Sequence, residues 1–170
     1  MLDKVATWQP MLAADLKHLK RLSDLLFPDY LEDYEVLEER WKICPLGCFI
    51  LKNYSFNAVG YALAHPAKLK APPKENRIFI VPEDADCFHI HDICMLYDYQ
   101  GYGYAGRVLR DIAAYALERG FNKLAIVAVH NSRRIWEKYG FKPLDDETYQ
   151  QKIKADYGDD CFYMVRTIEA

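Results

Sequence analysis

The sequence predicts an α/β fold in which a mixed β-sheet is flanked by helices. A strand over residues 88–96, a helix over 104–119 and an apolar strand over 123–129 form a strand–helix–strand unit, which implies a parallel, right-handed crossover. Two β-prone segments within residues 48–64 surround a polar turn, a pattern typical of an antiparallel hairpin. At this length, one domain over residues 1–170 is the default expectation.

The N-terminal half supplies two helices after a short β-prone piece at residues 5–8. Leucines three and four positions apart predict a helix over 12–26, and Pro28 ends it. A second helix is expected over 30–41, with acidic residues on one side. That acidic side is either a solvated face or the wall of a site for a cationic amine.

The rest of the chain alternates connections with short elements. Residues 65–86 contain four prolines and a small edge strand at 78–81, and so long a connection in a compact domain is usually functional or mobile. After the crossover unit we expect a short helix at 132–138, a polar segment at 144–160 and a last strand at 161–168.

Composition excludes several classes of function. A net charge of −3 gives no reason to expect nucleic-acid binding. The absence of a long apolar run argues against a membrane partner, and the N-terminus lacks a signal-peptide pattern, so a cytoplasmic location is expected. Five irregularly spaced cysteines indicate reduced thiols. Cys44 and Cys48 could form half a zinc site, but no second pair matches them, so no metal is expected.

A glycine-containing turn between the strand at 88–96 and the following helix predicts a phosphate site. Glycines let the backbone approach an anion closely, and the helix N-terminus adds partial positive charge. Gly-x-Gly-x-x-Gly also occurs in dinucleotide-binding folds, but here Glu118, the acidic residue that follows, lies inside the same helix. An ordinary strand–helix turn is the alternative. The turn consists of Gln100, Gly101, Tyr102, Gly103, Tyr104, Ala105 and Gly106.

Two motifs together resemble the GNAT superfamily of acetyl-CoA-dependent N-acetyltransferases. The family's pyrophosphate motif, Gln/Arg-x-x-Gly-x-Gly/Ala, matches residues 100–105. Its later motif, an aromatic residue followed by Glu-Lys-x-Gly-Phe, matches residues 136–141, and the order of elements agrees over nearly the whole chain. The resemblance implies a sheet that splays at its centre, between the strands at 88–96 and 123–129, with acetyl-CoA in the gap.

The resemblance also implies roles for individual residues around acetyl-CoA. The N–H groups of the turn at 101–106 would hold the pyrophosphate, and Asn131 would contact the pantetheine arm. The backbone of Ile93, Cys94 and Met95 would hydrogen-bond to that arm, and the Met95 N–H would stabilise the oxyanion of the reaction.

Two histidines are the candidates for the general base. His89 and His91 are two residues apart on one strand, which places them on one face, and imidazole titrates in the range suited to deprotonating an amine. Their positions match the histidine pair of arylalkylamine N-acetyltransferases. Asp92 would point the other way unless a bulge breaks the alternation. Packed histidines without chemistry, or a water relay to a distant carboxylate, are the alternatives.

The general acid is less well defined. Many family members carry a tyrosine where this chain has Trp136, and an indole N–H cannot serve as an acid. Tyr139, about one helical turn later, is the candidate, with core packing as its alternative role.

The leading hypothesis is an acetyl-CoA-dependent N-acetyltransferase that works by direct attack in a ternary complex. The acceptor would be a small-molecule amine or a peptide amine, selected by residues 28–41 and 65–86. A non-catalytic acyl-CoA-binding or regulatory module is the alternative, and an NAD-binding fold is a third. Whether the chain forms a homodimer is left open.

Overall fold

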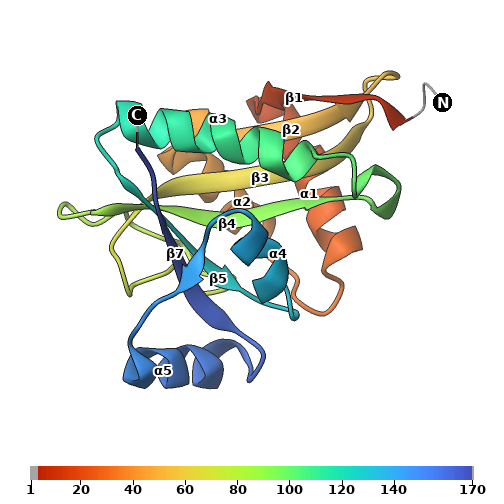
Figure 1. Cartoon of the computed structure of the whole chain (residues 1–170). Coiled ribbons are helices and arrows are strands. Elements are labelled where there is room, and N and C mark those ends of the chain that lie inside the picture. Colours follow the sequence, from red (N-terminus) through yellow and green to blue (C-terminus); the bar gives the residue numbers. More distant parts are fainter. Residues whose placement is uncertain (1–3, 170) are drawn as a thin grey trace.

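The computed structural model describes residues 4–169, and its centre is a seven-stranded mixed sheet (Figure 1). The strand order is β1-β2-β3-β4-β5-β7-β6, and only the β4–β5 pair is parallel. The α/β class with a mixed sheet is therefore confirmed. The strands are β1 (Ala6–Pro10), β2 (Cys48–Asn53), β3 (Ala58–Ala67), β4 (Cys87–Met95), β5 (Lys123–Ala128), β6 (Lys142–Pro143) and β7 (Phe162–Thr167).

Helices cover both faces of the sheet. Figure 1 shows α3 across one face, with α1 and α2 behind the sheet. Side chains alternate along the strands, so Ile90 of β4 packs in the cluster with α3, whereas Tyr61 and Leu63 of β3 pack with α1 and α2. The helices are α1 (Leu16–Leu26), α2 (Tyr34–Ile43), α3 (Tyr104–Glu118), α4 (Arg133–Lys138) and α5 (Glu147–Tyr157).

The sheet opens at its centre. β4 and β5 form only two registered pairs, Phe88 with Leu124 and His89 with Ala125. β4 nevertheless continues to Met95, and on its other side it stays paired with β3 up to that residue. Its last six residues therefore have one edge without a strand partner, and this gap positions the site described below.

Three segments differ from the sequence-based expectation. The second helix begins at Tyr34 rather than at residue 30, so residues 27–33 are a loop. Residues 78–81, expected to be an edge strand, have no strand structure. The polar segment at 144–160 contains α5, whose only buried residues are Gln150 and Ile153, too few to produce a visible apolar period. Within residues 4–169, no helix combines the length and apolar character needed to cross a membrane.

Candidate active site

A first cavity, of about 580 Å³, lies where the two central strands separate. It is lined by the end of β4, by the turn before α3 and by side chains of α4 and its C-terminal end. The lining includes eight residues that the sequence assigned to acetyl-CoA: Ile93, Cys94, Met95, Gln100, Gly101, Gly103, Tyr104 and Ala105.

The glycine turn is shaped as an open cradle. Gly101 and Gly103 have φ angles of +81° and +79°, a left-handed conformation that favours glycine, and a Cβ built on either would meet nothing within 4 Å. Gly103 is also the N-cap of α3, a helix of 15 residues. The turn has open space beside it and lies at a helix N-terminus, and its N–H groups at 101–106 have no backbone acceptor among the described residues. Together these features form a surface suited to phosphate.

The exposed edge of β4 offers backbone groups to the same cavity. The N–H of Leu96 donates to Val59 on the β3 side at 2.8 Å, so by the alternation along a strand the N–H of Met95 points into the gap. The Met95 carbonyl accepts a hydrogen bond from Gln100 Nε2 at 3.2 Å. Gln100 thus ties the glycine turn to the strand end.

The expected acetyl-CoA set also includes side chains that point away from this cavity or lie outside it. Tyr104 lines it, but its hydroxyl points away and donates to the Lys4 carbonyl at 2.8 Å. Gly106 lets α3 approach Tyr139, because a Cβ there would lie 3.2 Å from the Tyr139 ring. Tyr102 is half exposed beside Tyr104, and the Asn131 N–H donates to Asp160; neither residue lines either cavity.

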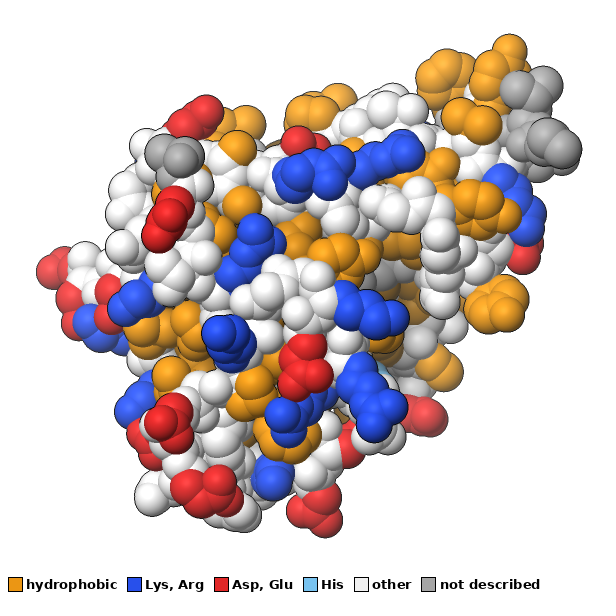
Figure 2. All heavy atoms as spheres, viewed as in Figure 1, with side chains coloured by type: hydrophobic (Ala, Val, Ile, Leu, Met, Phe, Trp, Pro, Cys, Tyr) orange, Lys and Arg blue, Asp and Glu red, His pale blue; other side chains and the backbone are white. Residues whose placement is uncertain are grey.

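The face around this cavity is basic. Figure 2 shows Lys and Arg side chains gathered across the middle of the face that α3 and α4 cover, with acidic side chains mainly around its edges. These two helices contribute the exposed Arg107, Arg110, Arg134 and Lys138. Although the chain is acidic overall, this face would attract a polyanion to the cavity.

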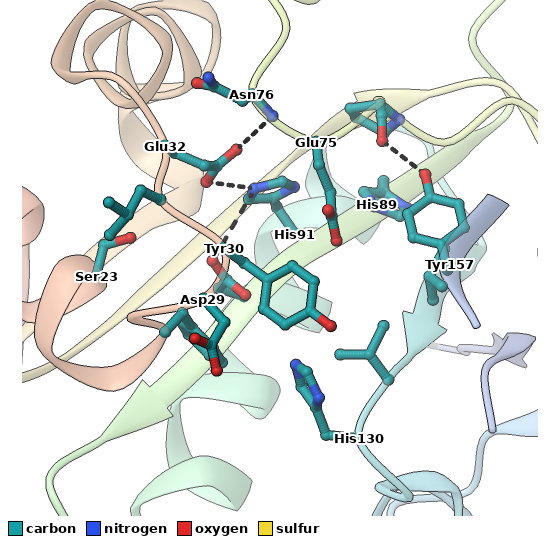
Figure 3. A pocket seen from close by; sticks show the side chains of 16 residues that line it. Ser23, Asp29, Tyr30, Glu32, Glu75, Asn76, His89, His91, His130 and Tyr157 are labelled. Carbon is teal, nitrogen blue, oxygen red and sulfur yellow. Dashed lines mark hydrogen bonds and ion pairs between the residues drawn. The ribbon is translucent and has the colours of Figure 1, made fainter. Parts of the chain in front are cut away.

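A second cavity, of about 270 Å³, adjoins the first, and Phe27 lines both. His89, His91 and Asp92 of β4 line it (Figure 3). The two candidate bases therefore line the second cavity, and the later residues of the same strand line the first. The other walls of the second cavity come from the end of β5 and the residues that follow it, from the end of α1 and the loop after it, from the connection between β3 and β4, and from Tyr157 of α5.

A β-bulge explains how Asp92 reaches this cavity. Opposite β4, Leu63 pairs with Asp92 and the next residue, Ala64, pairs with Ile90, which leaves His91 as the extra residue. The bulge interrupts the alternation, so His91 and Asp92 both line the cavity instead of facing opposite ways. The Tyr61 hydroxyl donates to Asp92 at 3.3 Å and fixes its orientation.

His91 is paired with Glu32, which lies in the loop before α2. The distance from His91 Nε2 to Glu32 Oε2 is 3.1 Å, and Asp92 Oδ2 lies 4.0 Å from the same nitrogen. Burial alone would lower the pKa of His91, but the hydrogen bond to Glu32 and the two carboxylate charges raise it above its usual value. His91 is therefore the more basic of the two candidate histidines.

His89, in contrast to His91, is buried without a carboxylate partner among the described residues. Its side chain is 3% exposed, and its Nδ1 has no hydrogen-bond partner among the described residues. Burial, the neighbouring His65 and His91 and the buried Arg40 hold the pKa of His89 well below its usual value. His89 is thus neutral in the fold.

His65, whose ring lies 5.7 Å from that of His89, is also buried, and its burial predicts that the fold loses stability in acid. Burial lowers the pKa of His65 to about 3, so His65 stays neutral in the fold at pH values where the unfolded chain is protonated. Stability should therefore fall as pH drops below about 6.5, by about 1 kcal/mol for His65 between pH 7 and 5.5. His91, with its raised pKa, contributes in the opposite direction.

Urea unfolding of the wild type and of His65→Leu at both pH values isolates this contribution. We expect the variant to be less stable at pH 7, because the Nδ1 hydrogen bond to the Pro66 carbonyl is lost. Its further loss on acidification should be smaller than that of the wild type by about 1 kcal/mol. An equal loss in both proteins would contradict a neutral His65.

The candidate acid lies at the first cavity. Tyr139, directly after α4, lines that cavity, and its ring lies 6.3 Å from the ring of Trp136. Trp136 packs edge-on against Phe141 at 5.5 Å and does not line either cavity. Trp136, at the position of the family's usual tyrosine, therefore serves packing in this chain. Tyr139 also packs, against Trp136, but its side chain reaches the first cavity.

Sequence reasoning gave no individual role to four residues that line the second cavity. Glu32 was one of several acidic residues on a helix side that was either solvated or the wall of an amine site. Tyr157 was placed in a polar segment, and Glu75 and Asn76 lie in a connection without a motif. The role of Asn76 becomes visible only in the folded chain, where its N–H donates to Glu32 at 3.3 Å and thereby joins the two loops. The donor atoms of Glu32, His91 and Asp92 lie within 4.8 Å of one another, so this set could also hold a metal ion.

Comparison with known proteins identifies relatives of this chain. A family model described as "Acetyltransferase (GNAT) family" matches residues 16–141. No curated protein sequence matches the chain. Among solved structures, Ard1 from Thermoplasma volcanium is similar, with 12% identity, a TM-score of 0.72 and coverage of 97% of this chain and 99% of that one.

Two further structures contain bound ligands. Arabidopsis thaliana Naa50, in complex with the bisubstrate analogue CoA-Ac-MVNAL, is 15% identical, with a TM-score of 0.69 and coverage of 96% and 99%. N-acetylglutamate synthase from Neisseria gonorrhoeae, complexed with coenzyme A and N-acetyl-glutamate, is 19% identical with a TM-score of 0.69; the match covers 98% of this chain but 36% of that one. At these identities the likeness shows the fold.

Proposed function

Because the chain belongs to the acetyltransferase (GNAT) family, we propose that it transfers an acetyl group from acetyl-CoA to a primary amine by direct attack in a ternary complex. Members of this family are acyltransferases, and structural neighbours bind coenzyme A or its conjugates. The observation that carries the proposal is the junction of the two cavities along β4. The glycine cradle lies at one end of this arrangement and the His91–Glu32 pair at the other.

The first cavity fits acetyl-CoA, which supplies a thioester-activated acetyl group when bound. The cradle at Gly101 and Gly103 has open space and free N–H groups for the pyrophosphate. The unpaired edge of Ile93 and Met95 has backbone groups for the pantetheine amides. The basic face beside the cavity supports the same assignment.

His91 acts as the base in this proposal. It accepts the proton that the attacking amine loses, and Glu32 stabilises the resulting imidazolium. Glu32 is a positioning residue in this account, because it acts through His91. The N–H of Met95 points into the gap and is placed to stabilise negative charge on the carbonyl oxygen.

Tyr139 is the proposed donor of the proton that the departing thiolate receives. It lines the first cavity, whereas Trp136 does not. A thiol has an ordinary pKa of about 8.5, so the thiolate can also leave without an acid, and the contribution of Tyr139 is expected to be smaller than that of His91.

Turnover with a panel of amines tests the proposal. The protein is mixed with acetyl-CoA and each amine, and release of free CoA thiol is followed with a thiol reagent. We expect acceptor-dependent thiol release and an acetylated product of the corresponding mass. Tight CoA binding without turnover of any amine would contradict the proposal and favour a non-catalytic acyl-CoA-binding module.

A further inference from the structure

We propose that the acceptor is a dicationic amine, such as an aliphatic diamine or polyamine, whose second ammonium group is held by carboxylates of the second cavity. This inference rests on the proposed function, and it assigns selectivity to Glu75 and Asp29. Both residues line the cavity, and both lie in segments that were expected to select the acceptor but that contain no recognisable motif.

The charge of the cavity wall is the first argument. Among the described residues, four carboxylates line it and no lysine or arginine does; the carboxylates belong to Asp29, Glu32, Glu75 and Asp92. Glu32 is paired with His91, but neither Asp29 nor Glu75 forms an ion pair or a hydrogen bond with another described residue. Figure 3 shows the Glu75 side chain extending toward the middle of the cavity, between His91, Tyr30 and Tyr157.

The two ends of the cavity have different tasks. At the sheet, His91 and Asp92 receive the amine that reacts, next to the cavity at the strand end. At the loops, Glu75 and Asp29 are exposed carboxylates that form no ion pair within residues 4–169. A ligand with one amine group fills only the sheet end of the cavity. A second ammonium group on the same ligand would reach the carboxylates at the loop end.

Buried groups at the sheet end also favour a cation. The carboxylates of Glu32 and Asp92 lie close together there, with oxygens 3.1 and 4.0 Å from the same His91 nitrogen. The neutral His89 presents Nδ1, an atom without a partner among the described residues, in a side chain that lines the same cavity. A cationic ligand relieves the repulsion between these carboxylates.

Aromatic walls complete the fit. Phe27, Tyr30 and Tyr157 line the cavity, and the rings of Tyr30 and His130 lie 5.2 Å apart. Ring faces attract alkylammonium groups, and the rings also pack against methylene groups. The Tyr157 hydroxyl is occupied, because it donates to the Pro73 carbonyl at 3.0 Å, so the ring itself is the available surface.

Four acceptors of equal chain length test the inference. They are 1,5-diaminopentane, pentylamine, 5-amino-1-pentanol and 5-aminopentanoate, which differ only at the end that does not react. The full chain is assayed with acetyl-CoA in the presence of EDTA, so that no metal ion occupies Glu32, His91 and Asp92. We expect kcat/KM for the diamine to exceed that for pentylamine at least about tenfold, with the carboxylate lowest, because like charges repel.

Variants locate the selectivity. Glu75→Gln and the double variant with Asp29→Asn should reduce the ratio of diamine to pentylamine kcat/KM, mostly through KM. Glu35→Gln is the matched control, because Glu35 is an exposed carboxylate of α2 that does not line the cavity. The diamine preference of the wild type should also fall as salt rises.

The outcomes separate this inference from the proposed function. Turnover of all four amines without a preference for the diamine overturns the inference and leaves the acetyltransferase intact. A preference for 2-phenylethylamine over the diamine also overturns it, since the aromatic walls would then select the acceptor. No turnover of any amine overturns the proposed function itself, and the inference with it.

Discussion

Gly103→Val is expected to weaken coenzyme A binding at least about tenfold, or 1.4 kcal/mol. A Cβ at Gly103 extends into space that lines the first cavity and contains no protein atom within 4 Å. The valine side chain would therefore occupy the space through which a phosphate must approach the turn N–H groups. Calorimetric titration of the protein with CoA measures the loss directly.

The left-handed backbone requires a matched control. At a φ of +79°, any side chain costs about 1–2 kcal/mol of stability, so a folding defect could imitate a binding defect. Gly120, just after α3, has a φ of +85° and the same open surroundings, but it lines neither cavity. Gly120→Val should lose similar stability and keep its CoA affinity. Equal affinity in the two variants would contradict the cradle.

The fold was largely predictable because its elements carry local signals. Leucine spacing predicted α1, and the glycine turn before an amphipathic helix predicted the crossover from β4 to β5. α5 was missed because it buries only Gln150 and Ile153 and therefore has no apolar stripe. The start of α2 was misplaced, although Asp33 directly precedes it and is a residue type favoured at an N-cap.

The second cavity was less predictable because it depends on pairing between distant segments. Asp92 lines it only because β3 and β4 pair with a bulge at His91, and no local pattern in β4 indicates that bulge. Glu32 reaches His91, 59 residues away in sequence, only because residues 27–33 form a loop. A helix over 30–41 would have left Glu32 as one of several acidic surface residues.

His91→Ala is expected to lower kcat by about 10²–10⁴ at neutral pH, the usual contribution of a general base. His91 works in its neutral form, so activity should rise with pH through its pKa. Glu32 and Asp92 raise that pKa, which places the acidic limb of the pH–rate profile above pH 6.5. If His89 were the base, the limb would lie below pH 6.5, because burial lowers the pKa of His89.

Glu32→Gln tests how the pair works while leaving His91 in place. Glutamine removes the charge that stabilises the imidazolium, so burial dominates and the acidic limb should move to lower pH. A purely structural role for Glu32 would instead lower the rate equally at every pH. Glu38→Gln, which breaks the exposed pair with Lys42 on α2, is the control and should leave the profile unchanged. A profile that is the same in the wild type, His91→Ala and Glu32→Gln would exclude His91 as the base and point to a water relay.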